Sequence, residues 1–136
     1  MDWENEDRFN QENEGGLGRE EIKEYVEQIE SILADNPQMN EATTKQAILS
    51  NFLELLDWKI PTNTQLEYSI NMGSGTHKVD YALIDESHPI AFFEAKSVGS
   101  NLTSDRGQIA SYMKNENVNW GILSDGKEYL FFHRNI

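Results

Sequence analysis

The spacing of apolar residues changes near residue 60 from helical to strand-like, and this change most constrains the fold. Apolar side chains recur at helical intervals from Arg19 to Ala34, and again from Asn40 to Leu56. Three short stretches, 65–70, 77–84 and 90–96, are then strand-like and enriched in β-branched and aromatic residues. We therefore expect two helices followed by three strands.

The rest of the chain continues as a helix and a hairpin. Helical spacing returns at 102–114, and two strand-like stretches, 119–124 and 127–133, flank the turn signal Asp125-Gly126. The expected order is α-α-β-β-β-α-β-β, an α/β fold with a mixed (α+β) sheet. The length of 136 residues suits one domain, which we place at 18–136, after an acidic and disordered segment at 1–17.

The chain has no cysteine, which excludes disulfides, zinc ribbons, iron–sulfur ligation and thiolate nucleophiles. No apolar run approaches the length of a membrane span, and the first residues are acidic rather than basic and then apolar. We therefore expect a cytoplasmic protein with no membrane partner.

Acidic residues outnumber basic ones by 24 to 11, which gives a net charge of −13. Residues 1–40 hold twelve acids and three bases (−9), and residues 41–136 hold twelve acids and eight bases (−4). This balance argues against nucleic-acid binding unless some acids bind metal or the surface is adapted to high salt. The segment 1–17 could shield a DNA site or only confer solubility, and solubility is the commoner role of a charge run.

Charged residues interrupt two of the apolar strand-like stretches. Asp80 lies in the second stretch, and Glu94 and Lys96 lie in the third. Because side chains alternate along a strand, Glu94 and Lys96 share a face. A hairpin that turns at Glu86-Ser87 brings Asp80 beside Glu94 or the residue before it. One face could then hold two carboxylates and one ammonium.

Two interpretations of this cluster are open. Solvated charged strands with a salt bridge are common, and periodicity alone favours that interpretation. Neighbouring carboxylates nevertheless repel each other unless they share a cation, and hard oxygen ligands suit Mg²⁺ or Mn²⁺. A metal ion there could activate water and offset phosphate charge.

Three more residues are candidates of lower specificity. Gln108 and Tyr112 lie four residues apart and so share one helix face, although spacing alone favours a surface Gln beside a core Tyr. Glu41 lies in the first turn of its helix, where a capping or helix-dipole role is common.

Six segments together carry a resemblance to a known family: Asn40–Thr44, Phe52–Trp58, Lys78–Ala82, Phe93–Lys96, Gln108–Tyr112 and Trp120–Gly126. They resemble the PD-(D/E)xK nuclease superfamily. The closer likeness is to the N-terminal nuclease domain of type I restriction enzyme R subunits and to predicted stand-alone type IV-like restriction endonucleases. E-x-K alone is a weak motif, but it is specific when combined with an upstream Asp and a downstream Q-x-x-x-Y. The resemblance implies a restriction-endonuclease-like core, αβββαβ, with an extra N-terminal helix and a C-terminal hairpin strand.

The resemblance also implies a role for each matching residue. Asp80 and Glu94 would bind the metal, with the backbone carbonyl of Ala95 as a further candidate ligand. Lys96 would be the catalytic lysine. The implied cofactor is Mg²⁺, with Mn²⁺ as a substitute.

Gln108 and Tyr112 would match the QxxxY element beside the site. Glu41 would match the first-helix glutamate that many members place near the metal. Glu54 competes for that role, but it lies thirteen residues on, about 220° around a regular helix, so the two cannot share a face. We prefer Glu41.

The expected function is a Mg²⁺-dependent endodeoxyribonuclease that hydrolyses DNA phosphodiester bonds in restriction, defence or DNA processing. The alternative is a DNA- or partner-binding module of the same fold that is inactive alone. Such a module would depend on a separate motor or specificity chain, because the sequence has no G-x-x-x-x-G-K-[ST] phosphate-binding motif. DNA is the expected partner, and a homodimer is plausible because cutting a duplex needs two sites.

Overall fold

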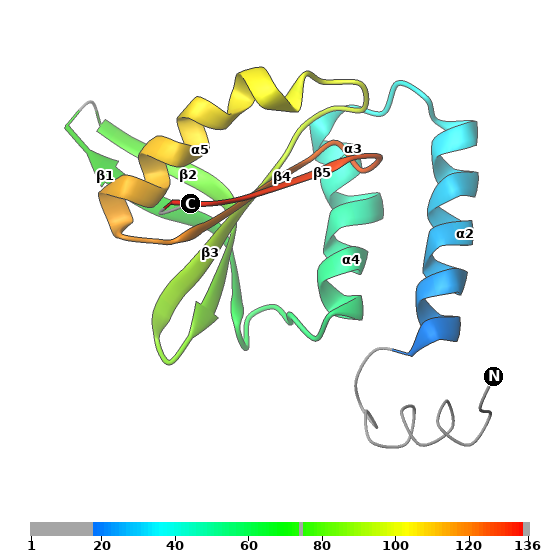
Figure 1. Cartoon of the computed structure of the whole chain (residues 1–136), viewed down its shortest axis with the longest axis horizontal. Helices are drawn as coiled ribbons and strands as arrows, with labels where there is room; N and C mark the ends of the chain where they lie inside the picture. Colours follow the sequence, from blue (N-terminus) through cyan, green and yellow to red (C-terminus); the bar gives the residue numbers. More distant parts are fainter. Residues whose placement is uncertain (1–17, 74, 135–136) are drawn as a thin grey trace.

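The computed structural model describes residues 18–73 and 75–134, so the acidic segment 1–17 lies outside the described residues. The elements within this range follow the expected order (Figure 1). They are α2 (Arg19–Asp35), α3 (Glu41–Thr44), the π-helix η1 (Lys45–Leu49), α4 (Ser50–Leu55), β1 (Thr64–Met72), β2 (Gly75–Asp85), β3 (His88–Ala95), α5 (Leu102–Glu116), β4 (Trp120–Ser124) and β5 (Tyr129–His133). No helix in this range is long and apolar enough to cross a membrane.

The strands form one five-stranded mixed sheet in the order β1-β2-β3-β4-β5. β3 and β4 are parallel, and every other neighbouring pair is antiparallel. The parallel pair requires a crossover, which α5 provides. The turn between β2 and β3 is formed by Glu86 and Ser87, both with positive φ, and the turn between β4 and β5 contains Asp125 and Gly126. The mixed α/β fold predicted from the sequence is confirmed.

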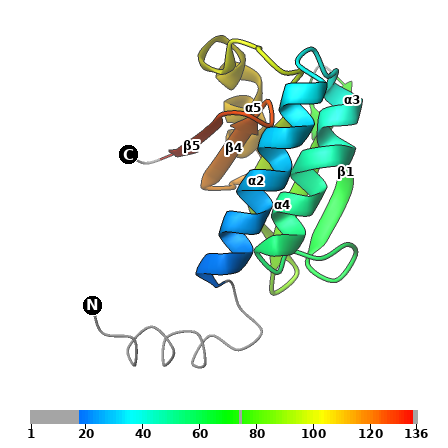
Figure 2. The ribbon, with the colours of Figure 1, turned by 90° about the vertical axis from the view of Figure 1, so that its right-hand side faces the viewer.

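Helices cover both faces of the sheet. α2 and α4 lie side by side on one face, and α5 lies on the other (Figures 1 and 2). One core cluster joins the first face to its helices and includes Ile29, Ile48, Leu53, Tyr81 and Phe93. The second joins the other face to α5 and includes Phe92, Ile109, Tyr112, Met113 and Leu123. The middle strand β3 is therefore buried on both sides.

The segment expected to be one regular helix contains a π turn. Asn40 caps its start, since its side chain accepts a hydrogen bond from the backbone N–H of Thr43 at 2.8 Å. The π-helix η1 then separates α3 from α4. Ile48 and Leu49, at the end of this turn, are both fully buried. The extra residue of the π turn shifts the upstream side chains around the axis relative to those downstream.

β3 pairs with only the C-terminal half of β2. Their last pair toward the start of β2 is Tyr81 with Phe93, whereas β2 stays paired with β1 as far as Gly75. We call this point of separation the fork. Asp80 and Glu94 lie directly beyond the last backbone pair of β2 and β3.

Candidate active site

Asp80 and Glu94 lie together at the fork and satisfy backbone groups of each other's strands. The backbone N–H of Ala95 donates to Asp80 Oδ2 at 2.8 Å, and the backbone N–H of Asp80 donates to Glu94 Oε1 at 3.3 Å. Both residues are buried, with 9% and 6% of their surface exposed. The carboxylates thus take the place of carbonyl acceptors where the β2–β3 ladder has stopped.

The surroundings of Glu94 disfavour its ionised form. Burial raises the pKa of Glu94 to about 7, and the charge of Asp80 acts in the same direction. Lys96 and the Asp80 N–H lower that pKa, and Glu41 raises it. The pair is a desolvated site of like charge, which an additional cation would stabilise.

Lys96 supplies one positive charge beside Glu94. It follows β3 directly, and its backbone N–H donates to the carbonyl of Ser124 on β4 at 2.8 Å. Its Nζ lies 3.9 Å from Glu94 Oε2. The structure thus brings the ammonium to Glu94, as expected from the strand alternation that puts both side chains on one face.

A second ammonium, which the sequence analysis missed, reaches Asp80 from the helical layer. Lys45 begins η1, and its Nζ lies 3.1 Å from Asp80 Oδ1 and 2.9 Å from Glu67 Oε1 on β1. Burial alone would lower the pKa of Lys45, but the hydrogen bonds and charges of Glu67 and Asp80 outweigh burial and raise it. The only signal in the sequence was the position of Lys45, one turn after Glu41.

The two candidates on α5, Tyr112 and Gln108, differ in burial. Tyr112 on α5 is buried, and its ring centroid lies 5.7 Å from that of His77 on β2. Burial raises the pKa of Tyr112, and the charges of Glu94 and Asp80 raise it further. Gln108 lies one turn earlier on α5 and is exposed.

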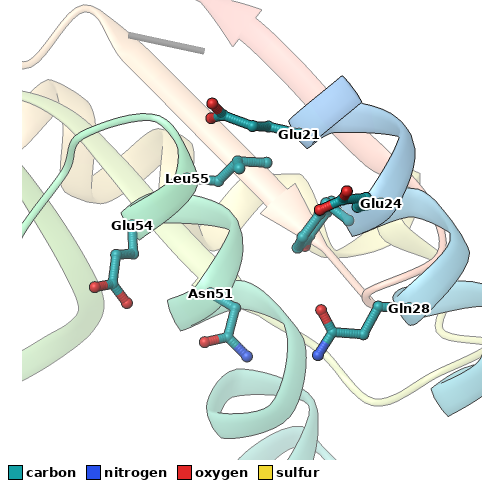
Figure 3. A pocket seen from close by; sticks show the side chains of 7 residues that line it. Glu21, Glu24, Gln28, Asn51, Glu54 and Leu55 are labelled. Carbon is teal, nitrogen blue, oxygen red and sulfur yellow. The ribbon is translucent and has the colours of Figure 1, made fainter. Parts of the chain in front are cut away.

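Glu41 and Glu54 occupy different surroundings. Glu41 begins α3, is exposed, and acts on the pKa of Glu94 through its charge. Glu54 instead lines a pocket between α2 and α4 with Glu21 and Glu24 (Figure 3). The role near a metal that the resemblance implies for Glu41 stays a prediction.

The oxygen atoms at the fork suit a small divalent cation. Among residues 18–73 and 75–134, no three His, Asp or Glu side chains come together as a metal site. The available donors are two carboxylates, Asp80 and Glu94, and the backbone carbonyl of Ala95. Mg²⁺ commonly binds through one or two carboxylates and completes its shell with water and substrate phosphate, so this donor set fits it.

Comparisons with known proteins bear on the fold and the family of this chain. A chain in the "cryoEM structure DrdV-DNA complex" matches with a TM-score of 0.53 and 18% identity, over 85% of this chain and 12% of that chain. Identity this low shows a shared fold, and the chain spans only a small part of its larger neighbour. No curated protein matches. The family described as "Type I restriction enzyme R protein N terminus (HSDR_N)" matches residues 40–136, which include every candidate discussed above. The chain therefore belongs to the family of type I restriction enzyme R protein N-termini.

Proposed function

We propose that this chain is a divalent-metal-dependent endodeoxyribonuclease that hydrolyses DNA phosphodiester bonds, with Mg²⁺ as its ion and Mn²⁺ as a substitute. The observation that carries the proposal is the buried pair Asp80 and Glu94 with Lys96 beside it. A buried carboxylate whose pKa is raised to about 7 is unfavourable for stability, and such groups gather at functional sites. Membership of a restriction-enzyme family supports a nuclease function for these three residues.

Each residue has a role in this proposal. Asp80, Glu94 and the carbonyl of Ala95 would hold the cation. When bound, it would supply an activated water molecule and offset charge on the scissile phosphate. The Lys96 ammonium would orient the attacking water and stabilise the negative charge that develops on the phosphate oxygens.

The other candidates would act around this centre. Tyr112 and Gln108 lie on α5, on the same face of the sheet as Glu94, and would contact DNA or position the metal-binding carboxylates. Glu41 would contribute negative charge from α3. DNA is the proposed partner, and a second copy of the chain would provide the second site that double-strand cleavage requires.

A second candidate function is a DNA- or partner-binding module that needs another chain for activity. The chain spans only 12% of the matched neighbour, and its net charge of −13 disfavours independent binding to DNA. In this case a separate motor or specificity chain would deliver DNA to the fork.

Cleavage assays separate the two functions. Supercoiled plasmid and single-stranded DNA are incubated with Mg²⁺ or Mn²⁺, from low to molar KCl, because phosphate binding is salt-sensitive and a salt-adapted protein needs salt to fold. Lys96→Ala is compared with Lys23→Ala, which removes an equal charge from the exposed surface of α2. Cleavage that requires metal and Lys96, but not Lys23, supports the nuclease. Absence of cleavage by folded protein under every condition overturns it in favour of the partner-dependent module.

A further inference from the structure

We propose that Lys45 is an internal counter-cation of this site, which neutralises Asp80 in the metal-free protein and moves onto Glu67 alone when a divalent ion binds. The inference rests on the proposed function, since it assigns Asp80 to a metal. It adds a residue that sets how tightly the metal binds.

The first observation is that the Lys45 ammonium bridges two carboxylates of unequal burial. Its Nζ lies 3.1 Å from Asp80 Oδ1 and 2.9 Å from Glu67 Oε1. The Asp80 side chain is 12% exposed, whereas that of Glu67 is 52% exposed. One partner is therefore in the site, and the other is at the surface.

The second observation is that Asp80 is oriented without Lys45. The N–H of Ala95 holds Asp80 Oδ2 at 2.8 Å, so the direction of the carboxylate is fixed from β3. Lys45 therefore acts on Asp80 mainly by neutralising its charge, and not by orienting it. A divalent cation on Oδ1 would share that oxygen with the ammonium and be repelled by it at short range. Lys45 should therefore compete with metal rather than prepare the site for it.

The third observation concerns Glu67. It lies opposite Asp80 in the β1–β2 register, between the pairs Leu66–Tyr81 and Tyr68–Val79, and it has a φ of 50°. A left-handed conformation within a strand is unfavourable for a residue other than glycine and persists only where its surroundings enforce it. In this conformation the Glu67 carboxylate contacts the Lys45 ammonium. The ammonium would therefore keep one partner after a metal ion displaced it from Asp80.

Metal binding without DNA tests the proposal. Free Mn²⁺ is measured by electron paramagnetic resonance during titration of the wild-type protein and variants. Lys45→Met keeps the length of the aliphatic stem and removes the charge, so it should bind Mn²⁺ about tenfold more tightly. Glu67→Gln leaves the ammonium with Asp80 alone, so it should bind more weakly than wild type. Lys45→Arg keeps the positive charge and should bind Mn²⁺ like wild type. Lys23→Met removes a positive charge from the exposed surface of α2 and should also bind Mn²⁺ like wild type.

The outcomes distinguish this inference from the function on which it rests. If wild type binds one Mn²⁺ but Lys45→Met binds equally or more weakly, Lys45 is not a competitor and the inference is wrong. If wild type, shown to be folded by circular dichroism, binds no Mn²⁺, the proposed metal site fails and this inference fails with it. If Lys45→Met does not fold, Lys45→Gln, which also removes the positive charge, decides: tighter binding than wild type supports the competition, and equal or weaker binding overturns it.

Discussion

Asp80 and Glu94 exchange hydrogen bonds across the fork: Asp80 accepts from the backbone beside Glu94, and Glu94 accepts from the backbone of Asp80. The same two carboxylates are the proposed metal ligands. Their side chains therefore take part in both the sheet and the site. Substitutions here must keep the acceptor oxygen if their effects on activity are to be separated from effects on folding.

Glu94→Gln should stabilise the metal-free protein while abolishing metal-dependent cleavage. The folded pKa of Glu94 is raised from 4.5 to about 7, so its favourable contribution is complete below pH 4.5 and is lost as pH rises through 7. At pH 8 in EDTA we expect the variant to be more stable by on the order of 2 kcal/mol. Urea unfolding at pH 5 and pH 8 measures the difference, which should be smaller at pH 5. Glu54→Gln is the control, and an equal gain there would contradict this explanation.

Tyr81 should make stability fall in alkaline solution. Its hydroxyl donates to the carbonyl of Lys45 at 3.2 Å and lies 3.0 Å from Ser50 Oγ. Burial raises the pKa of Tyr81 from 10 to about 12, so its contribution is complete below pH 10 and is lost between pH 10 and pH 12. Tyr81→Phe should lower stability at pH 8 by about 1 kcal/mol and reduce the further loss above pH 10. Thermal unfolding of wild type and Tyr81→Phe from pH 8 to pH 11.5 measures how the stability of each protein depends on pH. Parallel curves would show that Tyr81 does not cause the alkaline loss.

Gly126→Ala should destabilise the fold by about 1–3 kcal/mol. Gly126 has a φ of 88°, and a Cβ there would lie 2.8 Å from Ile48 Cδ1 and 3.1 Å from Thr44 Cγ2. The substitution therefore combines backbone strain with a clash against the helical layer. Gly99→Ala is the matched control, since Gly99 has a φ of 89° and a Cβ there meets no atom within 4 Å. Urea unfolding compares them, and equal stability of the two variants would rule out the clash.

Asn40→Ala should cost about 1 kcal/mol, because the N–H of Thr43 loses its side-chain acceptor. Asn40→Asp and Asn40→Ser preserve an acceptor and should remain close to wild type. Differential scanning calorimetry of the three variants measures the ranking. A loss shared by all three would show that Asn40 acts through something other than its cap.

Local rules brought Asp80 close to Glu94 but did not decide which residue of β3 lies opposite it. The two-residue turn at Glu86-Ser87 alone would place Asp80 opposite Phe93, and a register shift between Leu83 and Ile84 moves Asp80 opposite Glu94. The capping role of Asn40 and the turn at Asp125-Gly126 follow from similarly short-range preferences. These features depend only on residues close in sequence or joined by one short hairpin.

The surroundings of the pair depend on contacts between distant elements. Lys45 meets Asp80 across 35 positions, from the first residue of a π turn that no spacing rule predicted. The positive φ of Glu67 is likewise a tertiary effect, since nothing local to a strand favours it. The burial of Tyr112 and the exposure of Gln108 follow the expectation from their spacing, but only the packing of α5 on the sheet places the Tyr112 ring beside His77.

The π turn also allows this helix to lose one residue. A π turn holds one residue more than an α turn, so deleting the exposed Gln46 would let the turn adopt α geometry while Glu41 kept nearly its present direction relative to α4. A deletion within α4 has no extra residue to absorb it and would rotate the upstream side chains by about 100°. Loss of one residue should therefore be tolerated at this turn and poorly tolerated elsewhere in the same helix.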